Sequence, residues 1–125
     1  MTPTVEERDV IFKKFGRAFF KQDMEAMYEV VHPTFTWTVL VDGVVRKLQS
    51  REAIEAYFAE RKGKVLNTRF EDVVYHHSPD ATFMTYRMTG TDAASGDAIS
   101  KVGIERYTFE GGMLAVKDVY SRDES

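Results

Sequence analysis

Two acidic residues stand in otherwise apolar stretches near the C-terminus of the chain. In KVGIERYTFEGGMLAVKDVY, residues 101–120, Glu105 and Asp118 lie on either side of a Gly-Gly pair. The alternating pattern predicts two strands joined by a tight turn at Glu110 and Gly111. Because antiparallel partners keep a constant sum of residue numbers, we expect residue 105 opposite residue 118, with the two Cβ atoms about 5 Å apart.

A pair of acids at this distance is suited to proton transfer. Two negative charges in a pocket of low dielectric constant repel each other, so one of the acids should keep its proton near neutral pH. The pair then offers a general acid beside a general base, as enolisation, cyclisation, dehydration or epoxide opening requires. On this hypothesis Asp118 is the base, Glu105 is the acid or modulates the base, and Asp118→Asn abolishes activity.

Two structural alternatives stay open for these acids. A β-bulge in either strand would turn one of the two side chains to the other face of the sheet. Arg87, on the neighbouring predicted strand, could reach both acids and neutralise them as an ion-pair cluster. If the acids are instead catalytic, Arg87 would stabilise developing negative charge.

The elements that would position these residues can be read from the rest of the chain. Thr4 and Glu7 form a capping box that begins a first helix, a short second helix ends at Pro33, and a third runs from Ser50 to Gly63. Helices on one face of an antiparallel sheet predict an α+β fold, which we expect to be a single domain over residues 1–125. The predicted strands are 35–41 and 44–48, joined at Asp42-Gly43, followed by 66–77, 82–91, 98–109 and 113–121.

Aromatic residues recur on the predicted inner faces of these elements. They either fill a core or line a cavity for a flat, apolar ligand, whose orientation tyrosine hydroxyls and the indole N–H would fix. The candidate lining residues are Phe15, Phe19, Trp37, Tyr57, Tyr107 and Tyr120.

Composition excludes several classes of function. The net charge is −3 with both signs interspersed, so no basic face is available for nucleic acid or a membrane surface. The chain has no cysteine, no long apolar run and an acidic start, so we expect a cytoplasmic protein. His76 and His77 are adjacent in a predicted strand and point to opposite faces. Neither a metal site nor a cofactor site is predicted, and no residue has the context of a covalent nucleophile.

Several stretches resemble the nuclear transport factor 2-like superfamily, in particular its SnoaL-like and ketosteroid-isomerase-like members. FKQDMEAMYEVVHPTFTW resembles the end of the family's first helix, the turn after it and the next strand, and SREAIEAYFAE resembles its third helix. YRMTGTD and IERYTFEGGMLAVKDVY resemble its last strands. The resemblance implies a cone: three N-terminal helices packed on a strongly curved antiparallel sheet, with a deep apolar pocket inside.

The same resemblance bears on individual residues. In ketosteroid isomerases the general base is an aspartate, and Val39, which we also expect to contact a ligand in the pocket, falls at its position. Phe15 falls at the position of the oxyanion-hole tyrosine. Only the acidic member of that oxyanion hole has a counterpart, Glu105, so the isomerase mechanism is not implied. SnoaL-like cyclases also use an acidic residue and no cofactor, which by analogy favours Asp118.

Three hypotheses follow for function. The first is an enzyme without a cofactor that transfers protons on a small hydrophobic molecule through Asp118 and Glu105. The second is a non-catalytic protein that binds a hydrophobic or acidic molecule in the same pocket, with Arg87 pairing the ligand carboxylate. The third is an interaction module that forms a homodimer through the convex face of the sheet. The apolar residues expected on that face are Val102, Ile104, Ala115 and Val119.

Overall fold

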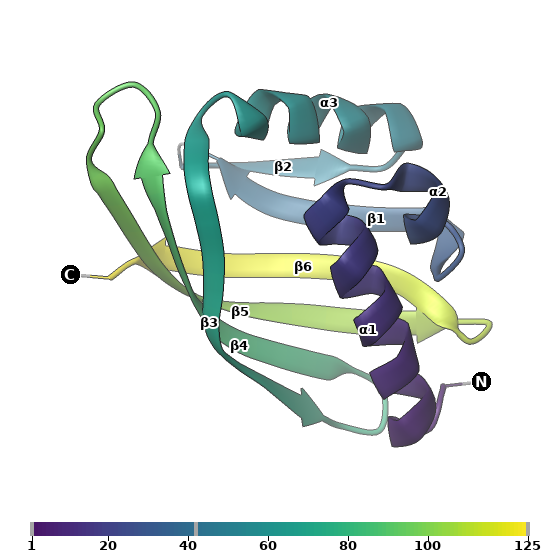
Figure 1. Ribbon diagram of the computed structural model, residues 1–125. Helices are drawn as coiled ribbons and strands as arrows, with labels where there is room; N and C mark the ends of the chain where they lie inside the picture. The colour runs from purple at the N-terminus through teal and green to yellow at the C-terminus, as the bar shows by residue number, and fades with distance from the viewer. Residues whose placement is uncertain (1, 42, 125) are drawn as a thin grey trace.

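The computed structural model of the protein describes residues 2–41 and 43–124. It confirms the predicted α+β class: three helices lie on one side of a six-stranded sheet (Figure 1). The helices are α1 (Val5–Lys21), α2 (Met24–Met27) and α3 (Arg51–Lys62), and none of them has the length and apolar content to cross a membrane. The strands are β1 (Val31–Val41), β2 (Val44–Leu48), β3 (Val65–His77), β4 (Thr82–Asp92), β5 (Ala98–Glu110) and β6 (Met113–Asp123).

The helix ends follow the predicted capping residues. The Thr4 hydroxyl accepts a hydrogen bond from the Glu7 amide at 3.2 Å, and the Glu7 carboxylate accepts one from the Thr4 amide at 2.8 Å, which completes the capping box. At the start of α3, the Ser50 hydroxyl accepts a hydrogen bond from the Ala53 amide at 3.1 Å, and Gly63 caps the other end.

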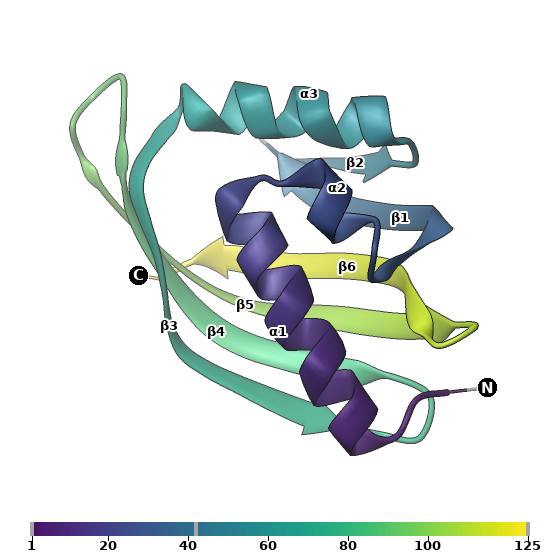
Figure 2. The ribbon, with the colours of Figure 1, turned by 45° about the vertical axis from the view of Figure 1, so that its right-hand side comes forward.

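The sheet has the order β2-β1-β6-β5-β4-β3 and bends around α1, with α3 along its β1–β2 end (Figure 2). Consecutive strands pair antiparallel, but β1 and β6 run parallel. The prediction of a purely antiparallel sheet is therefore wrong for this pair. Short connections impose antiparallel pairing only on strands that follow one another, and most of the chain lies between β1 and β6.

The region between α1 and β1 also departs from the prediction. The second helix is only four residues long, and β1 begins at Val31, so Pro33 lies in a strand and does not end a helix. A break in the register between Val31 and Thr36 accommodates this residue, which has no amide hydrogen to donate. Of the predicted Asp42-Gly43 turn, Asp42 lies outside the described residues, and Gly43 has a φ of +78°.

Aromatic packing fills the half of the inner sheet face that lies under α1. Phe12 stacks on Tyr75 with a centroid distance of 4.8 Å and meets Tyr107 edge-on at 4.9 Å. One helical turn later, the Phe15 ring meets the Tyr107 ring with a centroid distance of 6.1 Å. These contacts close the end of the sheet near the N-terminus of α1 and leave the other end, below α3, for a site.

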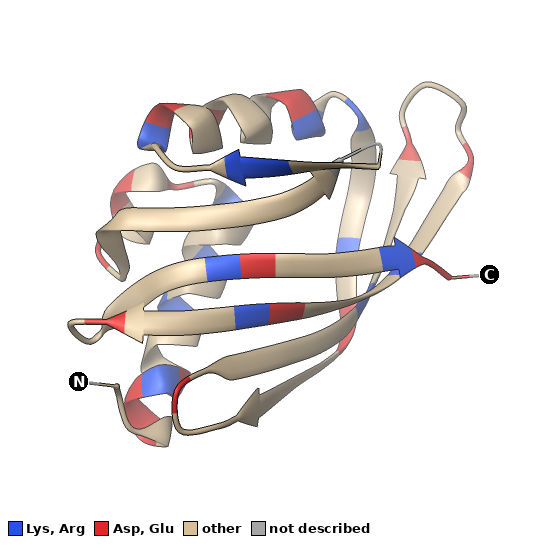
Figure 3. Ribbon diagram, turned by 180° about the vertical axis from the view of Figure 1, so that it is seen from behind, with Lys and Arg blue, Asp and Glu red and all other residues tan. Residues whose placement is uncertain are grey.

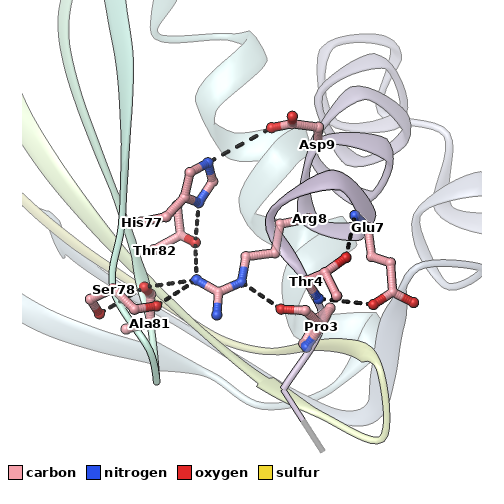
Figure 4. Close-up of polar contacts among 9 residues, drawn as sticks. All are labelled: Pro3, Thr4, Glu7, Arg8, Asp9, His77, Ser78, Ala81 and Thr82. Atoms are coloured by element: carbon pink, nitrogen blue, oxygen red, sulfur yellow. Dashed lines mark hydrogen bonds and ion pairs between the residues drawn. The ribbon is translucent and has the colours of Figure 1, made fainter.

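A buried arginine fixes α1 to the turn between β3 and β4. The Arg8 guanidinium donates hydrogen bonds to the carbonyl oxygens of Pro3, Ser78 and Ala81 at 2.9, 2.7 and 3.2 Å (Figure 4). It donates another to the carbonyl oxygen of Pro79 at 2.9 Å. It also donates to the Thr82 hydroxyl at 3.2 Å. Since carbonyl and hydroxyl oxygens surround the guanidinium, its role is to join the helix to the sheet.

Replacing this arginine should destabilise the protein. In Arg8→Met the apolar side chain leaves the carbonyl oxygens of the turn buried without a donor, which costs about 2–3 kcal/mol. The free energy of unfolding, measured by urea denaturation, should fall by this amount. The matched control is Arg17→Met, an exposed position of the same helix; equal losses in both variants would contradict the structural role of Arg8.

Candidate functional site

One extra residue in β6 sets the orientation of the strand that follows it. Thr108 pairs with Val116, whereas the next residue, Phe109, pairs with Leu114, so Ala115 has no partner in β5. This β-bulge turns every later side chain of β6 to the opposite face from the one predicted.

The predicted pairing of the two acids is wrong for this reason. Glu105 lies opposite Val119, and Asp118 lies opposite Arg106. Asp118 therefore belongs to the outer face of the sheet. The charged bands of β5 and β6, which include residues of both faces, lie side by side at mid-sheet (Figure 3). The bulge that the sequence left open as an alternative is the arrangement that the protein adopts.

Lys117 occupies the inner position that was predicted for Asp118. Its side chain and that of Glu105 are both buried, with 3% and 4% of their surfaces exposed, and Lys117 Nζ lies 3.4 Å from Glu105 Oε1. The Tyr107 hydroxyl donates a hydrogen bond to the same oxygen. The site is thus an ammonium and a carboxylate in contact, with a phenol as the third member.

Aromatic rings surround the Lys117 ammonium. Nζ lies 3.8 Å from the ring centroid of Phe19, 4.8 Å from that of Trp37 and 5.4 Å from that of Phe15. Trp37 is brought there by the parallel pairing of β1 with β6, in which it is the partner of Lys117. Burial lowers the pKa of Lys117, and the Glu105 carboxylate opposes this effect without cancelling it.

A cavity of about 290 Å³ opens in front of the buried pair. Its wall is mostly apolar, and Glu105 and Lys117 are the charged groups on its inner side. The cavity reaches the surface, because Phe20, with 66% of its side chain exposed, also contributes to its wall. The principal apolar lining residues are Phe19, Trp37, Val39, Tyr57, Phe58, Tyr86 and Met88.

The predicted ligand-binding residues divide into three groups. Phe19, Trp37, Val39 and Tyr57 line the cavity together with Glu105. Phe15 and Tyr107 are buried core residues in contact with members of the site, Lys117 and Glu105 respectively.

Arg87 and Tyr120 lie elsewhere, on the outer face. Arg87 Nε is 2.7 Å from Glu124 Oε1, and Arg87 Nη1 is 4.0 Å from Glu71 Oε2. Since Tyr86 and Met88 line the cavity, the alternation of side chains places Arg87 outside, so the predicted cluster of Arg87 with Glu105 and Asp118 is wrong. Tyr120 lies opposite Ile104 and is 64% exposed.

Three residues of the site were missed from the sequence: Lys117, Tyr86 and Arg61. The sequence did hold a signal for Tyr86: a glycine inside a strand, here Gly103, often marks the close approach of another group. The Tyr86 ring lies against the backbone of Gly103. A Cβ atom at Gly103 would lie 2.5 Å from the Tyr86 hydroxyl oxygen, so any other residue there would displace the Tyr86 ring. Burial and the Glu105 carboxylate raise the pKa of both Tyr86 and Tyr107, which keeps these phenols neutral.

Trp37 brings an unpaired hydrogen-bond donor to the cavity wall. Its Nε1 is buried and has no hydrogen-bond partner among residues 2–41 and 43–124. A buried N–H without an acceptor is costly, so this donor lowers the stability of the protein.

The histidines lie away from this cavity. His77 contacts the Thr82 hydroxyl at 3.0 Å and Asp9 at 3.7 Å, beside Arg8 (Figure 4). Among the residues that the structure describes, no three His, Asp or Glu side chains gather in a way that could hold a metal ion.

Comparison with known proteins gives the family. The model of the SnoaL-like domain matches residues 12–116. The chain belongs to the SnoaL-like domain family. No curated protein matches the sequence.

Solved structures resemble this SnoaL-like domain over nearly its whole length. An NTF2-like protein from Burkholderia xenovorans LB400 has a TM-score of 0.81 at 13% identity, over 95% of this chain and 92% of that chain. A candidate polyketide cyclase from Xanthomonas campestris pv. campestris has a TM-score of 0.74 at 14% identity, over 92% of this chain and 90% of that chain. A protein with a ketosteroid isomerase-like fold from Catenulispora acidiphila DSM 44928, in complex with trimethylamine, has a TM-score of 0.71 at 13% identity, over 96% of this chain and 86% of that chain. At these identities the likeness shows the fold alone.

The lowered pKa of Lys117 gives this residue a pH-dependent effect on stability. The unfolded chain holds the Lys117 proton up to the ordinary pKa of 10.5, whereas the folded protein releases it at lower pH. The unfolded state therefore binds more protons in this window, so the wild-type protein should gain stability relative to Lys117→Met as pH rises from neutral toward 10.5. Thermal melts of both proteins across this range measure the difference in Tm.

Two features make this comparison specific. Tyr86 and Tyr107, whose pKa is raised, lower the stability of both proteins above about pH 10. Their effect cancels in the difference. Lys13→Met, at an exposed position of α1, controls for the loss of one positive charge. A difference in Tm that stays constant with pH would show that buried Lys117 keeps its proton.

Proposed function

We propose that this SnoaL-like domain is an enzyme without a cofactor that transfers protons on a small, mostly apolar molecule held in the cavity. The observation that carries the proposal is the position of Glu105: a buried carboxylate at the wall of an apolar cavity, with an ammonium 3.4 Å away. A base and an acid held together at low dielectric constant are what proton abstraction next to a carbonyl group requires.

The two oxygen atoms of Glu105 have different surroundings. The contacts from Lys117 and Tyr107 both go to Oε1. Neither of these contacts goes to Oε2, so this oxygen is the atom that takes the substrate proton. Lys117 Nζ then lies beside the oxygen on which negative charge develops, and the rings of Phe19 and Trp37 keep water from this region.

The likeness in fold to a candidate polyketide cyclase and to a ketosteroid isomerase-like protein supports this class of reaction. It does so by analogy only, because one fold can support many activities. The choice of Glu105 rests on the site of this chain, and Asp118 has no part in it.

Exchange of α-hydrogens for deuterium tests the proposal. Cyclohexanone and 2-tetralone in D₂O, followed by NMR, should exchange faster with the protein than with buffer alone. Glu105→Gln should lower the catalysed rate by about a hundredfold or more, because a positioned general base contributes about 10²–10⁴-fold. Asp118→Asn removes a carboxylate from the outer face of the same hairpin and is the matched control.

The outcomes separate the two acids. Full loss in Glu105→Gln with full activity in Asp118→Asn supports the site described above. Activity that survives Glu105→Gln, in a variant shown by circular dichroism to be folded, would contradict the assignment of Glu105 as the base.

Binding of an acidic ligand without turnover is a second candidate function. Among the residues that the structure describes, the cavity wall includes the cations Arg61, Lys62, Lys101 and Lys117 but only one acid, Glu105. Arg61 makes no ion pair with the residues that the structure describes, and its charge acts on both Lys117 and Tyr86. An apolar molecule with a carboxylate would place its apolar part against the aromatic wall and its charge beside Arg61.

Trp37, the single tryptophan of the chain, reports on this binding because it lines the cavity. Titration with 2-naphthoate should change its fluorescence, and Arg61→Met should raise the Kd about tenfold, since a hydrogen bond to a charged group contributes about 1.5 kcal/mol. Arg17→Met, an exposed arginine outside the cavity wall, should leave the Kd unchanged. Equal affinity for neutral 2-methylnaphthalene would show that charge does not select the ligand.

A homodimer through the outer face of the sheet remains a proposal. Ile104 and Tyr120, which lie opposite each other there, are 46% and 64% exposed. Val119 was expected on this face, but the bulge at Ala115 turns it to the cavity wall, and Tyr120 takes its place. The exposed apolar surface of β5 and β6 supports self-association.

A further inference from the structure

Lys117 differs from the other lysines that the structure describes, because it alone is buried. Its amine nevertheless lies at the wall of a cavity that reaches solvent. We propose that Lys117 Nζ forms an imine with an aldehyde or ketone that enters this cavity. This inference rests on the proposed function and names its substrate class, small carbonyl compounds.

The cavity suits such a partner. Its volume of about 290 Å³ is at the lower limit of ligand pockets, which selects small molecules, and its wall beyond the charged pair is aromatic and aliphatic. Asn67, Thr68 and exposed Phe20 lie on the same wall, so a molecule can enter from solvent and meet Lys117 at the inner end.

The surroundings of Lys117 favour a reactive amine. A lysine acts as a nucleophile only when it is neutral, and burial lowers the pKa of Lys117. The Glu105 carboxylate, 3.4 Å away on β5, accepts the proton that the ammonium must release. Arg61 from α3 also favours the neutral amine, and Tyr86 from β4 and Tyr107 from β5 are uncharged phenols. The remaining titratable groups of the cavity wall are Tyr57 and Lys62 from α3 and Lys101 from β5.

The reaction balances without an oxidant or reductant. The neutral Nζ attacks the carbonyl carbon and forms a C–N bond, and the carbonyl oxygen takes up a proton to give a carbinolamine. The C–O bond then breaks and the oxygen leaves as water, so two protons of the original ammonium depart with it and the positive charge stays on the nitrogen. Glu105 holds the proton between these steps.

The same groups that surround the ammonium also fit the product. A protonated imine is a cation on the same nitrogen, and the faces of Phe19 and Trp37 together with the Glu105 carboxylate attract it. Since the iminium withdraws electrons from the neighbouring carbon, its formation would also ease the removal of a proton by Glu105 Oε2.

Reductive trapping tests the inference directly. The folded protein is incubated with benzaldehyde and sodium cyanoborohydride near neutral pH, and the sites of benzylation are located by peptide mass spectrometry. Lys117 should be labelled faster than exposed Lys13 and Lys14, because its lowered pKa raises the fraction of neutral amine. In urea, where the cavity is lost, the rate at Lys117 should fall to that of the others.

Controls within the chain make the result specific. Lys117→Met should lose the fast-labelled site, and Asp118→Asn should keep it. The comparison of lysines within one native molecule needs no variant, so a failure of Lys117→Met to fold does not affect it. Labelling of Lys117 at or below the rate of Lys13 in the native protein would overturn the imine proposal.

This test is separate from the deuterium exchange of the previous subsection. Exchange that depends on Glu105, without fast labelling of Lys117, leaves the acid/base proposal standing and removes the imine. Fast labelling of Lys117 without exchange supports the imine and contradicts the acid/base function.

Discussion

Burial of two opposite charges in an apolar interior is the constraint on which the rest of the structure depends. Removing a carboxylate and an ammonium from water costs several kcal/mol for each ion unless both find partners. Here Glu105 receives the Tyr107 hydroxyl and the Lys117 ammonium on one oxygen, and aromatic faces cover the remainder of the ammonium. Lys117 comes from β6 and Trp37 from β1, so the register of β5 with β6 and of β1 with β6 must both be correct for the site to form.

The cavity follows from the way in which the two long helices divide the inner face of the sheet. The rings of α1 fill the end nearest the N-terminus, where Arg8 ties the helix to the turn between β3 and β4. At the other end the wall includes side chains of α3 and of the end of α1, and space remains between them. Tyr86 can lie flat against β5 only because Gly103 has no side chain. The absence of a Cβ at one position thus helps to keep the site open.

The features that could be predicted from the sequence are local. The capping residues Thr4 and Ser50 and the last four strands depend on neighbours in the chain, and the structure has them nearly where the pattern put them. The bulge at Ala115 could not be predicted, because apolar residues stand at both candidate inner positions of β6, so either register gives a plausible pattern. The parallel pairing of β1 with β6 has no local signal. Arg87 was wrongly predicted to lie on the same face as Glu105. Its neighbours Tyr86 and Met88 are large apolar residues and indicate that they, and not Arg87, take the inner face.

The parallel pair has a consequence for how the site forms during folding. Trp37 and Lys117 are neighbours in the sheet although 80 residues separate them in the sequence (117 − 37), so their contact closes one of the longest loops in the fold. Contacts of such high sequence separation are costly in chain entropy and tend to form late. The meander of β3 to β6 has only local connections and needs no help from β1 to pair. A chain with a formed meander and an undocked β1 would hold Lys117 in water, as an ordinary surface lysine, until the last strand pairing takes it out of solvent.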